Sequence, residues 1–132
     1  MGDYKAMLAL DELAREVHDT ATEKGWHSEP RSIGEEIALM HSELSEALEE
    51  VRDSKPLLYF RLPDGTETGD PYSVGPFENV PNKAEGVAAE FADVIIRILD
   101  TAQERGIPVV DALLHKKAYN RTRPFRHGGK AL

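Results

Sequence analysis

The feature that most constrains this fold is a helical apolar period in two segments, each about twenty residues long. Apolar residues recur every three or four positions in residues 33–53 and again in residues 83–105. Each stripe covers one side of a helix, so both segments are predicted to be amphipathic helices. Ser32 and Glu35 have the spacing of a capping box before the first helix, and Gly106 follows the second. The stripes consist of Ile33, Ile37, Met40, Leu44, Leu48 and Val51 in the first helix and Val87, Phe91, Val94, Ile95, Ile98, Leu99 and Ala102 in the second.

Two further helices are predicted over residues 4–24 and 108–120, and an irregular basic tail over residues 121–132. Residues 54–82 differ in kind, since they hold five prolines and three glycines. We expect this insert to be a long loop, or to carry a small β-hairpin in which residues 57–62 form a strand and residues 63–65 a turn. The sequence thus predicts an all-α fold, a four-helix bundle with this insert between its second and third helices. Residues 1–132 are expected to form one domain.

Composition narrows the classes of function. A formal net charge of −8 argues against general nucleic-acid binding, although residues 115–132 carry six Lys or Arg and no acid. There is no Cys, which excludes disulfides, thiolate metal sites and thiol catalysis. No apolar run approaches the roughly 20 residues that span a bilayer, and no secretory signal is apparent. A cytoplasmic protein that does not bind membranes is the expectation.

Two carboxylate pairs occupy matched positions on the two long helices. Glu43 and Glu46 are three residues apart, as are Glu90 and Asp93. Each first acid lies about 90° around the helix axis from the apolar stripe, and each second acid lies about 60° from the first. If the stripes pack together, the four carboxylates meet on one side, where they would repel one another without a cation. Hard oxygen ligands suit Mg²⁺ or Mn²⁺. A solvated acidic surface is the simpler alternative.

At these residues the chain resembles the MazG-like, all-α nucleoside triphosphate pyrophosphatase superfamily, which includes dUTP- and dCTP-cleaving enzymes. The family pattern Glu-Glu-x-x-Glu followed by Glu-x-x-Asp reads Ser-Glu-Leu-Ser-Glu at residues 42–46 and Glu-Phe-Ala-Asp at residues 90–93. Ser42 thus replaces the leading Glu. Trp26 with Pro30 and Arg31, and the Lys-x-x-x-Asn-Arg run at residues 116–121, also resemble family segments, as does the basic tail.

The resemblance implies Mg²⁺-dependent hydrolysis of nucleoside triphosphates to monophosphates and pyrophosphate, with Mn²⁺ as a possible substitute. The metal ligands would be Glu43, Glu46, Glu90 and Asp93. Glu43, Glu46 or Glu50 would accept the proton of the attacking water. The substrate phosphates are expected to contact Lys116, Arg121 and Arg123. Asn120 would hydrogen-bond to the sugar or base, and the Trp26 ring would stack on the base.

Other functions stay open at this stage. One is a phosphoribosyl-ATP pyrophosphatase of the same superfamily. A second is a non-catalytic helical interaction module whose insert binds a partner, and a third is weak nucleic-acid binding by the tail. We expect at least a dimer, because four helices in a small chain cannot bury both faces of the long pair. The family resemblance implies a homodimer or homotetramer. Leu39 and Ile96 are apolar residues that lie off the main stripes, and they also favour an oligomer.

Overall fold

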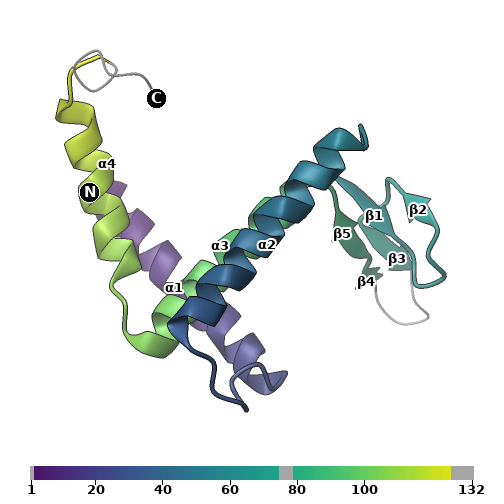
Figure 1. The fold of residues 1–132 in the computed structure, drawn as a ribbon, viewed down its shortest axis with the longest axis horizontal. Helices are drawn as coiled ribbons and strands as arrows, with labels where there is room; N and C mark the ends of the chain where they lie inside the picture. Colours follow the sequence, from purple (N-terminus) through teal and green to yellow (C-terminus); the bar gives the residue numbers. More distant parts are fainter. Residues whose placement is uncertain (1, 75–78, 126–132) are drawn as a thin grey trace. The chain divides into compact units, whose positions relative to one another are not determined.

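The structure is a computed structural model that describes residues 2–74 and 79–125, and this part of the chain forms four helices and five short strands (Figure 1). The helices are α1 (Gly2–Glu23), α2 (Ile33–Arg52), α3 (Val87–Arg105) and α4 (Val109–Thr122). The strands all lie between α2 and α3 and are β1 (Tyr59–Arg61), β2 (Glu67–Thr68), β3 (Tyr72–Val74), β4 (Asn79–Pro81) and β5 (Lys83–Glu85).

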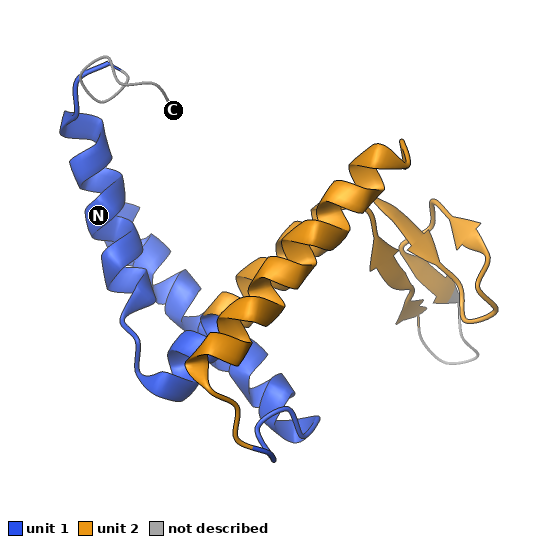
Figure 2. Ribbon diagram, in the orientation of Figure 1, with its two compact units in different colours: residues 1–29, 99–132 blue, residues 30–98 orange. Residues whose placement is uncertain are grey.

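The chain divides into two compact units, and the boundary falls inside α3 (Figure 2). The first unit runs to residue 29 and resumes at residue 99, so it holds α1, α4 and the last turns of α3. In this unit α1 packs against α4. The second unit, residues 30–98, holds α2, all the strands and the beginning of α3.

The predicted all-α class is wrong, because the insert is not a loop. Strands β2, β1 and β5 form an antiparallel sheet in that order, and β3 pairs with β4 in a second antiparallel sheet. The expected hairpin is present as β1 and β2, but residues 83–85 were assigned to a helix and instead pair with β1. Each strand has only two or three residues, which is too short for an alternating pattern to be read from the sequence.

Local signals at the helix ends agree with the structure. The Ser32 hydroxyl accepts a hydrogen bond from the Glu35 backbone N–H at 3.1 Å and so caps the start of α2. Gly25 ends the turn after α1 with a φ of 82°, in the left-handed region that favours glycine. Such short-range signals explain why the helix boundaries near residues 25, 32 and 106 were predictable.

The apolar stripe of α2 does not face the interior. Its members Ile33, Ile37, Leu44, Leu48 and Val51 are 44–59% exposed. The buried residues of α2 are instead Glu36, Glu43 and Ala47. On a wheel of about 100° per residue, the buried line lies roughly 85° from the apolar stripe. The expectation that α2 and α3 pack through their apolar stripes is therefore wrong, and the acid-bearing sides face inward.

Among the residues that the structure describes, no helix combines the length and the apolar character that a membrane span requires.

Candidate metal centre

The four carboxylates predicted from helical spacing come together in the second unit. Ligand oxygens of Glu43, Glu90 and Asp93 all lie within 4.8 Å of one another. Glu43 and Glu90 are 8% and 9% exposed, whereas Asp93 and Glu46 lie at the exposed rim. Glu46 is close enough to hydrogen-bond with the carboxyl groups of Glu43 and Glu90. Thus the buried Glu43 of α2 meets the buried Glu90 of α3. The acid three residues later on the same helix, Glu46 or Asp93, lies beside each of them.

A second group of acids continues from the first. Ligand oxygens of Glu50, Glu85 and Glu90 also lie within 4.8 Å of one another. The buried Tyr59 hydroxyl lies 3.1 and 3.0 Å from the two Glu50 oxygens and donates its hydrogen bond there. Tyr59 and Glu85 are directly opposite each other in the β1–β5 register. The sheet therefore adds Glu85 and Tyr59 to the centre. Sequence reasoning missed both, because it placed Tyr59 in the insert and Glu85 in the third helix.

Arg97 is a third contributor that the sequence analysis did not single out. Its Nε donates to Glu43 Oε1 at 2.9 Å, across α2 and α3. Arg97 lies seven residues after Glu90, two helical turns along the same side of α3. That spacing could have identified it as a partner of the acid cluster.

Burial and like charge set the protonation of the cluster. Burial, followed by the neighbouring carboxylates of Glu43 and Glu46, raises the pKa of Glu90 to about 8. Burial and the charge of Glu43 also raise the pKa of Asp93. Burial acts to raise the pKa of Glu43 too, but hydrogen bonds from Arg97 and from the neighbouring acids outweigh it, and the net pKa is lowered. At neutral pH the metal-free cluster therefore holds a proton on Glu90 beside an ionised Glu43.

One atom of the cluster lacks the partner that a buried polar atom needs. Oε2 of Glu90 is buried and has no hydrogen-bond partner. An unsatisfied buried oxygen is costly, on the order of 1–3 kcal/mol. A cation among the oxygens of Glu43, Glu90 and Asp93 would satisfy it and would neutralise the repulsion. An all-oxygen ligand set fits Mg²⁺ or Mn²⁺, so the residues present fit the predicted metal.

Gly86 joins the sheet to the helix that carries Glu90. Its φ is 99°, and a Cβ at this position would lie 2.6 Å from the Leu57 carbonyl oxygen and 2.8 Å from that of Pro56. The Gly86 carbonyl accepts the Glu90 backbone N–H at 3.1 Å, and the Ala88 N–H donates to Leu57. The chain that leaves α2 thus passes directly over the start of α3, which only a residue without a side chain permits.

The predicted substrate residues lie in the first unit, whereas the carboxylates lie in the second. Lys116, Asn120 and Arg121 are exposed on α4, and Arg123 follows at its C-cap. The Arg123 guanidinium lies 5.7 Å from the centre of the Tyr119 ring. Trp26, in the turn after α1, is 41% exposed. The basic tail from residue 126 on lies outside the described residues.

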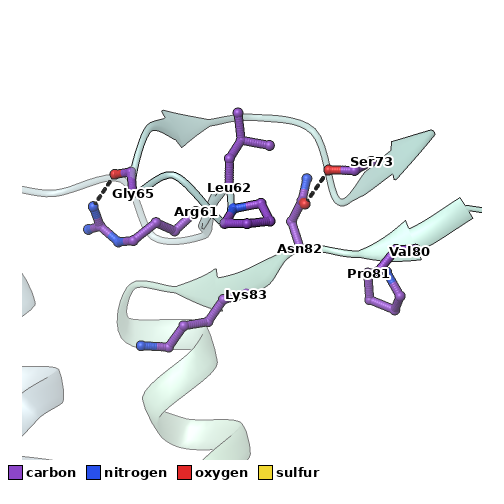
Figure 3. A pocket seen from close by; sticks show the side chains of 9 residues that line it. Arg61, Leu62, Gly65, Ser73, Val80, Pro81, Asn82 and Lys83 are labelled. Atoms are coloured by element: carbon purple, nitrogen blue, oxygen red, sulfur yellow. Dashed lines mark hydrogen bonds between the residues drawn. The ribbon is translucent and has the colours of Figure 1, made fainter. Parts of the chain in front are cut away.

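Residues of the strands and of the turns between them line an open pocket of about 540 Å³ (Figure 3). Arg61 and Lys83 line one part of it and Ser73, Val80 and Asn82 another, and the Ser73 hydroxyl donates to Asn82 at 2.6 Å. The Lys83 ammonium lies 3.2 Å from Glu85, a member of the second acid group. Lys83 also acts to lower the pKa of Asp93 through its charge. One residue therefore connects the pocket with both groups of acids.

Comparison with known proteins adds no relative: no family model, curated protein or solved structure matches the chain.

Proposed function

We propose that this protein hydrolyses nucleoside or deoxynucleoside triphosphates to the monophosphate and pyrophosphate, with Mg²⁺ held by Glu43, Glu46, Glu90 and Asp93. The observation that carries the proposal is the convergence of the two carboxylate pairs around a buried oxygen of Glu90 that has no partner. Carboxylates that lie only on a solvated surface would instead stay apart and hydrated. The resemblance to the MazG-like superfamily supplies the reaction class.

The side chains divide the chemistry in the following way. Bound Mg²⁺ would neutralise the triphosphate and polarise the phosphorus that water attacks. Glu43 enters the reaction ionised, because Arg97 balances its charge at 2.9 Å. Glu50 is the proposed acceptor of the water's proton. The Tyr59 hydrogen bond orients its carboxylate, and burial followed by Glu50 raises the Tyr59 pKa, so the phenol stays a donor.

The substrate needs positive charge for its phosphates and a surface for its base. Lys116, Arg121 and Arg123 are the proposed phosphate contacts, and Arg can hold two phosphate oxygens at once. Asn120 would bind the sugar or base, and Trp26 would stack on the base. The insert offers Lys83 beside the acids and a pocket whose volume falls in the range of small-molecule sites.

Activity is tested by incubating the full chain and Mg²⁺ with each nucleoside triphosphate, each deoxynucleoside triphosphate and phosphoribosyl-ATP. We expect pyrophosphate and a monophosphate from at least one of the first two classes. Glu46→Ala and Asp93→Ala should each lower turnover on the order of 100-fold or more, as expected for loss of an electrostatic stabiliser. Release from phosphoribosyl-ATP alone would assign the enzyme to that narrower class.

Glu49→Ala is the matched control for these variants, since Glu49 lies on α2 about 120° around the axis from Glu43. It should retain the native rate. The absence of pyrophosphate from every nucleotide at micromolar protein would refute the proposed function. Full activity in both Glu46→Ala and Asp93→Ala would place the metal elsewhere.

We also propose that the protein works as a homodimer or a homotetramer. The support is the α2 stripe defined above, a continuous apolar surface on one helix that is 44–59% exposed. Among the described residues, no large side chain is fully buried, so the single chain builds only a small core. A second copy of this chain, whose α2 carries the same stripe, is the occupant with matching chemistry.

Leu44→Glu combined with Leu48→Glu should convert the oligomer to a monomer, because two charges would be buried in a self-complementary apolar contact. The molar mass by light scattering measures this. Leu113 on α4 is 53% exposed in the native chain. Leu113→Glu therefore serves as the control that should not change the mass. A native protein that is monomeric at millimolar concentration would contradict the prediction.

A further inference from the structure

A second cluster of ligand-type side chains lies in the first unit, which is the blue part of Figure 2. His18 comes from the last turns of α1, and His27 from the turn that follows Gly25. Asp100 and Glu104 are four residues apart on α3 and so lie on the same side of that helix. None of the four is used in the proposed hydrolysis.

Asp100 accepts hydrogen bonds from both imidazole rings. Nδ1 of His18 lies 3.0 Å and Nε2 of His27 lies 2.8 Å from the same oxygen, Oδ1 of Asp100. The Asp100 side chain is 7% exposed. An ionised carboxylate only accepts hydrogen bonds, so in a neutral ring the nitrogen beside Asp100 is the one that carries the proton. Asp100 thereby selects the tautomer of both histidines.

The remaining ring nitrogens both face Glu104. Nε2 of His18 lies 3.4 Å and Nδ1 of His27 lies 4.0 Å from Oε2 of Glu104. In the tautomers that Asp100 selects, both nitrogens present lone pairs to a carboxylate oxygen. Three acceptors directed at one another repel, and a cation placed between them removes that repulsion. A positive charge between these two ring nitrogens and the Glu104 carboxylate would therefore be stabilised.

We propose that His18, His27 and Glu104 bind a divalent transition metal ion of the Zn²⁺ type, with Asp100 as a positioning residue. The three ligand atoms all lie within 4.8 Å of one another. Ligands at about 2.1 Å from a tetrahedral ion are roughly 3.4 Å apart. The His18–Glu104 distance already has this value, and Glu104, with 41% exposure, can move the few tenths of an ångström that His27 requires.

The ligand chemistry separates this centre from the carboxylate centre. Imidazole nitrogen selects Zn²⁺, Co²⁺, Ni²⁺ or Cu²⁺ over Mg²⁺, whereas an all-oxygen set favours the harder ion. A buried carboxylate that accepts the second N–H of each ligating histidine is the usual support of such sites. Three protein ligands leave one tetrahedral position open to water. The ion would tie the end of α1 and the Trp26 turn to α3.

The test is a titration of the full chain with Co²⁺ in excess Mg²⁺, which is added to occupy the proposed carboxylate centre. We expect one equivalent of Co²⁺ to give a visible absorption band that Zn²⁺ abolishes. Trp26, the single Trp of the chain and the neighbour of His27, gives a second readout through quenching of its fluorescence. His18→Ala and His27→Ala should lose both signals. Asp100→Asn keeps every ligand and should weaken Co²⁺ binding by roughly 10–100-fold.

Matched controls keep the outcome clear. His41→Ala and His115→Ala should bind Co²⁺ like the native chain, and Glu90→Gln should too, which separates this site from the proposed hydrolysis. Far-UV circular dichroism verifies folding, and His18→Gln or His27→Gln replaces the corresponding alanine variant if that variant does not fold. No Co²⁺ band in the folded native protein, or a band that persists without His18 and without His27, overturns the site. An Asp100→Asn variant with native affinity overturns the positioning role.

Discussion

Glu90→Gln is expected to abolish Mg²⁺-dependent hydrolysis and, in the absence of metal, to make the protein more stable at pH 8 than the native chain. Glutamine keeps the shape of the carboxyl group but cannot ionise. It removes a metal ligand from the centre, so turnover should fall on the order of 100-fold or more. It also removes the repulsion that an ionised Glu90 meets beside Glu43 and Glu46.

The sign of the stability change follows from the pKa of Glu90. In the unfolded chain this carboxyl titrates near 4.5, whereas in the folded metal-free protein its pKa is raised to about 8. Between these values the folded state holds a proton that the unfolded state has lost. The free energy of unfolding of the native chain therefore decreases from about pH 4.5 to about pH 8, with a slope of at most about 1.4 kcal/mol per pH unit from this group. Glu90→Gln removes this loss.

Urea unfolding at pH 5 and at pH 8, with EDTA present, measures the effect. The gain from Glu90→Gln should be small at pH 5 and reach a few kcal/mol at pH 8. Mg²⁺ should narrow the difference at pH 8, because saturation at about 100 times Kd stabilises the native chain by about 2.7 kcal/mol and the variant far less. Glu49→Gln, on another side of α2, is the control. If the free energy of unfolding depended on pH equally in the native chain and in Glu90→Gln, the raised pKa of Glu90 would be contradicted.

Gly86→Ala is expected to cost at least about 3 kcal/mol of folding stability and to remove activity with it. A positive φ costs a residue with a side chain roughly 1–2 kcal/mol. The new Cβ would also lie 2.6 Å from the Leu57 carbonyl oxygen, which is backbone and cannot rotate away. Relief of this contact requires the segment before β1 or the first turn of α3 to move. That turn carries the hydrogen bond from Glu90 to Gly86.

Gly65→Ala separates the two causes. Gly65 has a similar φ of 91°, but nothing lies within 4 Å of its added Cβ. Thermal and urea unfolding should show a loss of about 1–2 kcal/mol for Gly65→Ala, which is the backbone strain alone. The excess in Gly86→Ala is the steric contact between the two chain segments. Equal losses for both variants would mean that the segment after α2 does not pass over Gly86.

The helical part of the site could be predicted because helical geometry is local. A residue in a helix reaches the same side every three or four positions, whatever the rest of the chain does. That rule placed Glu43 and Glu46 on one helix and Glu90 and Asp93 on another in equivalent positions, and the structure brings them together. The rule predicts spacing around an axis but not which side packs inward, so the buried side of α2 was predicted wrongly.

The sheet and its contributions could not be predicted from the same rules. The three-residue strand β5 exists because it pairs with β1, more than twenty positions away. That pairing aligns Tyr59 with Glu85 and brings both to Glu50 and Glu90. The contact between His18, His27 and Asp100 likewise joins residues more than seventy positions apart. No local period carries such information.

By itself, then, the amino-acid sequence determined four helices, the cap at Ser32 and two matched pairs of carboxylates, because dihedral preferences and hydrogen bonds within a few residues decide these features. Only the tertiary structure decided that the acid-bearing side of α2 is buried while its apolar stripe is exposed, and that the insert is a sheet. It also decided which distant side chains hydrogen-bond to one another or face a common point. Those outcomes depend on burial and charge summed over the whole fold, which short-range patterns do not encode.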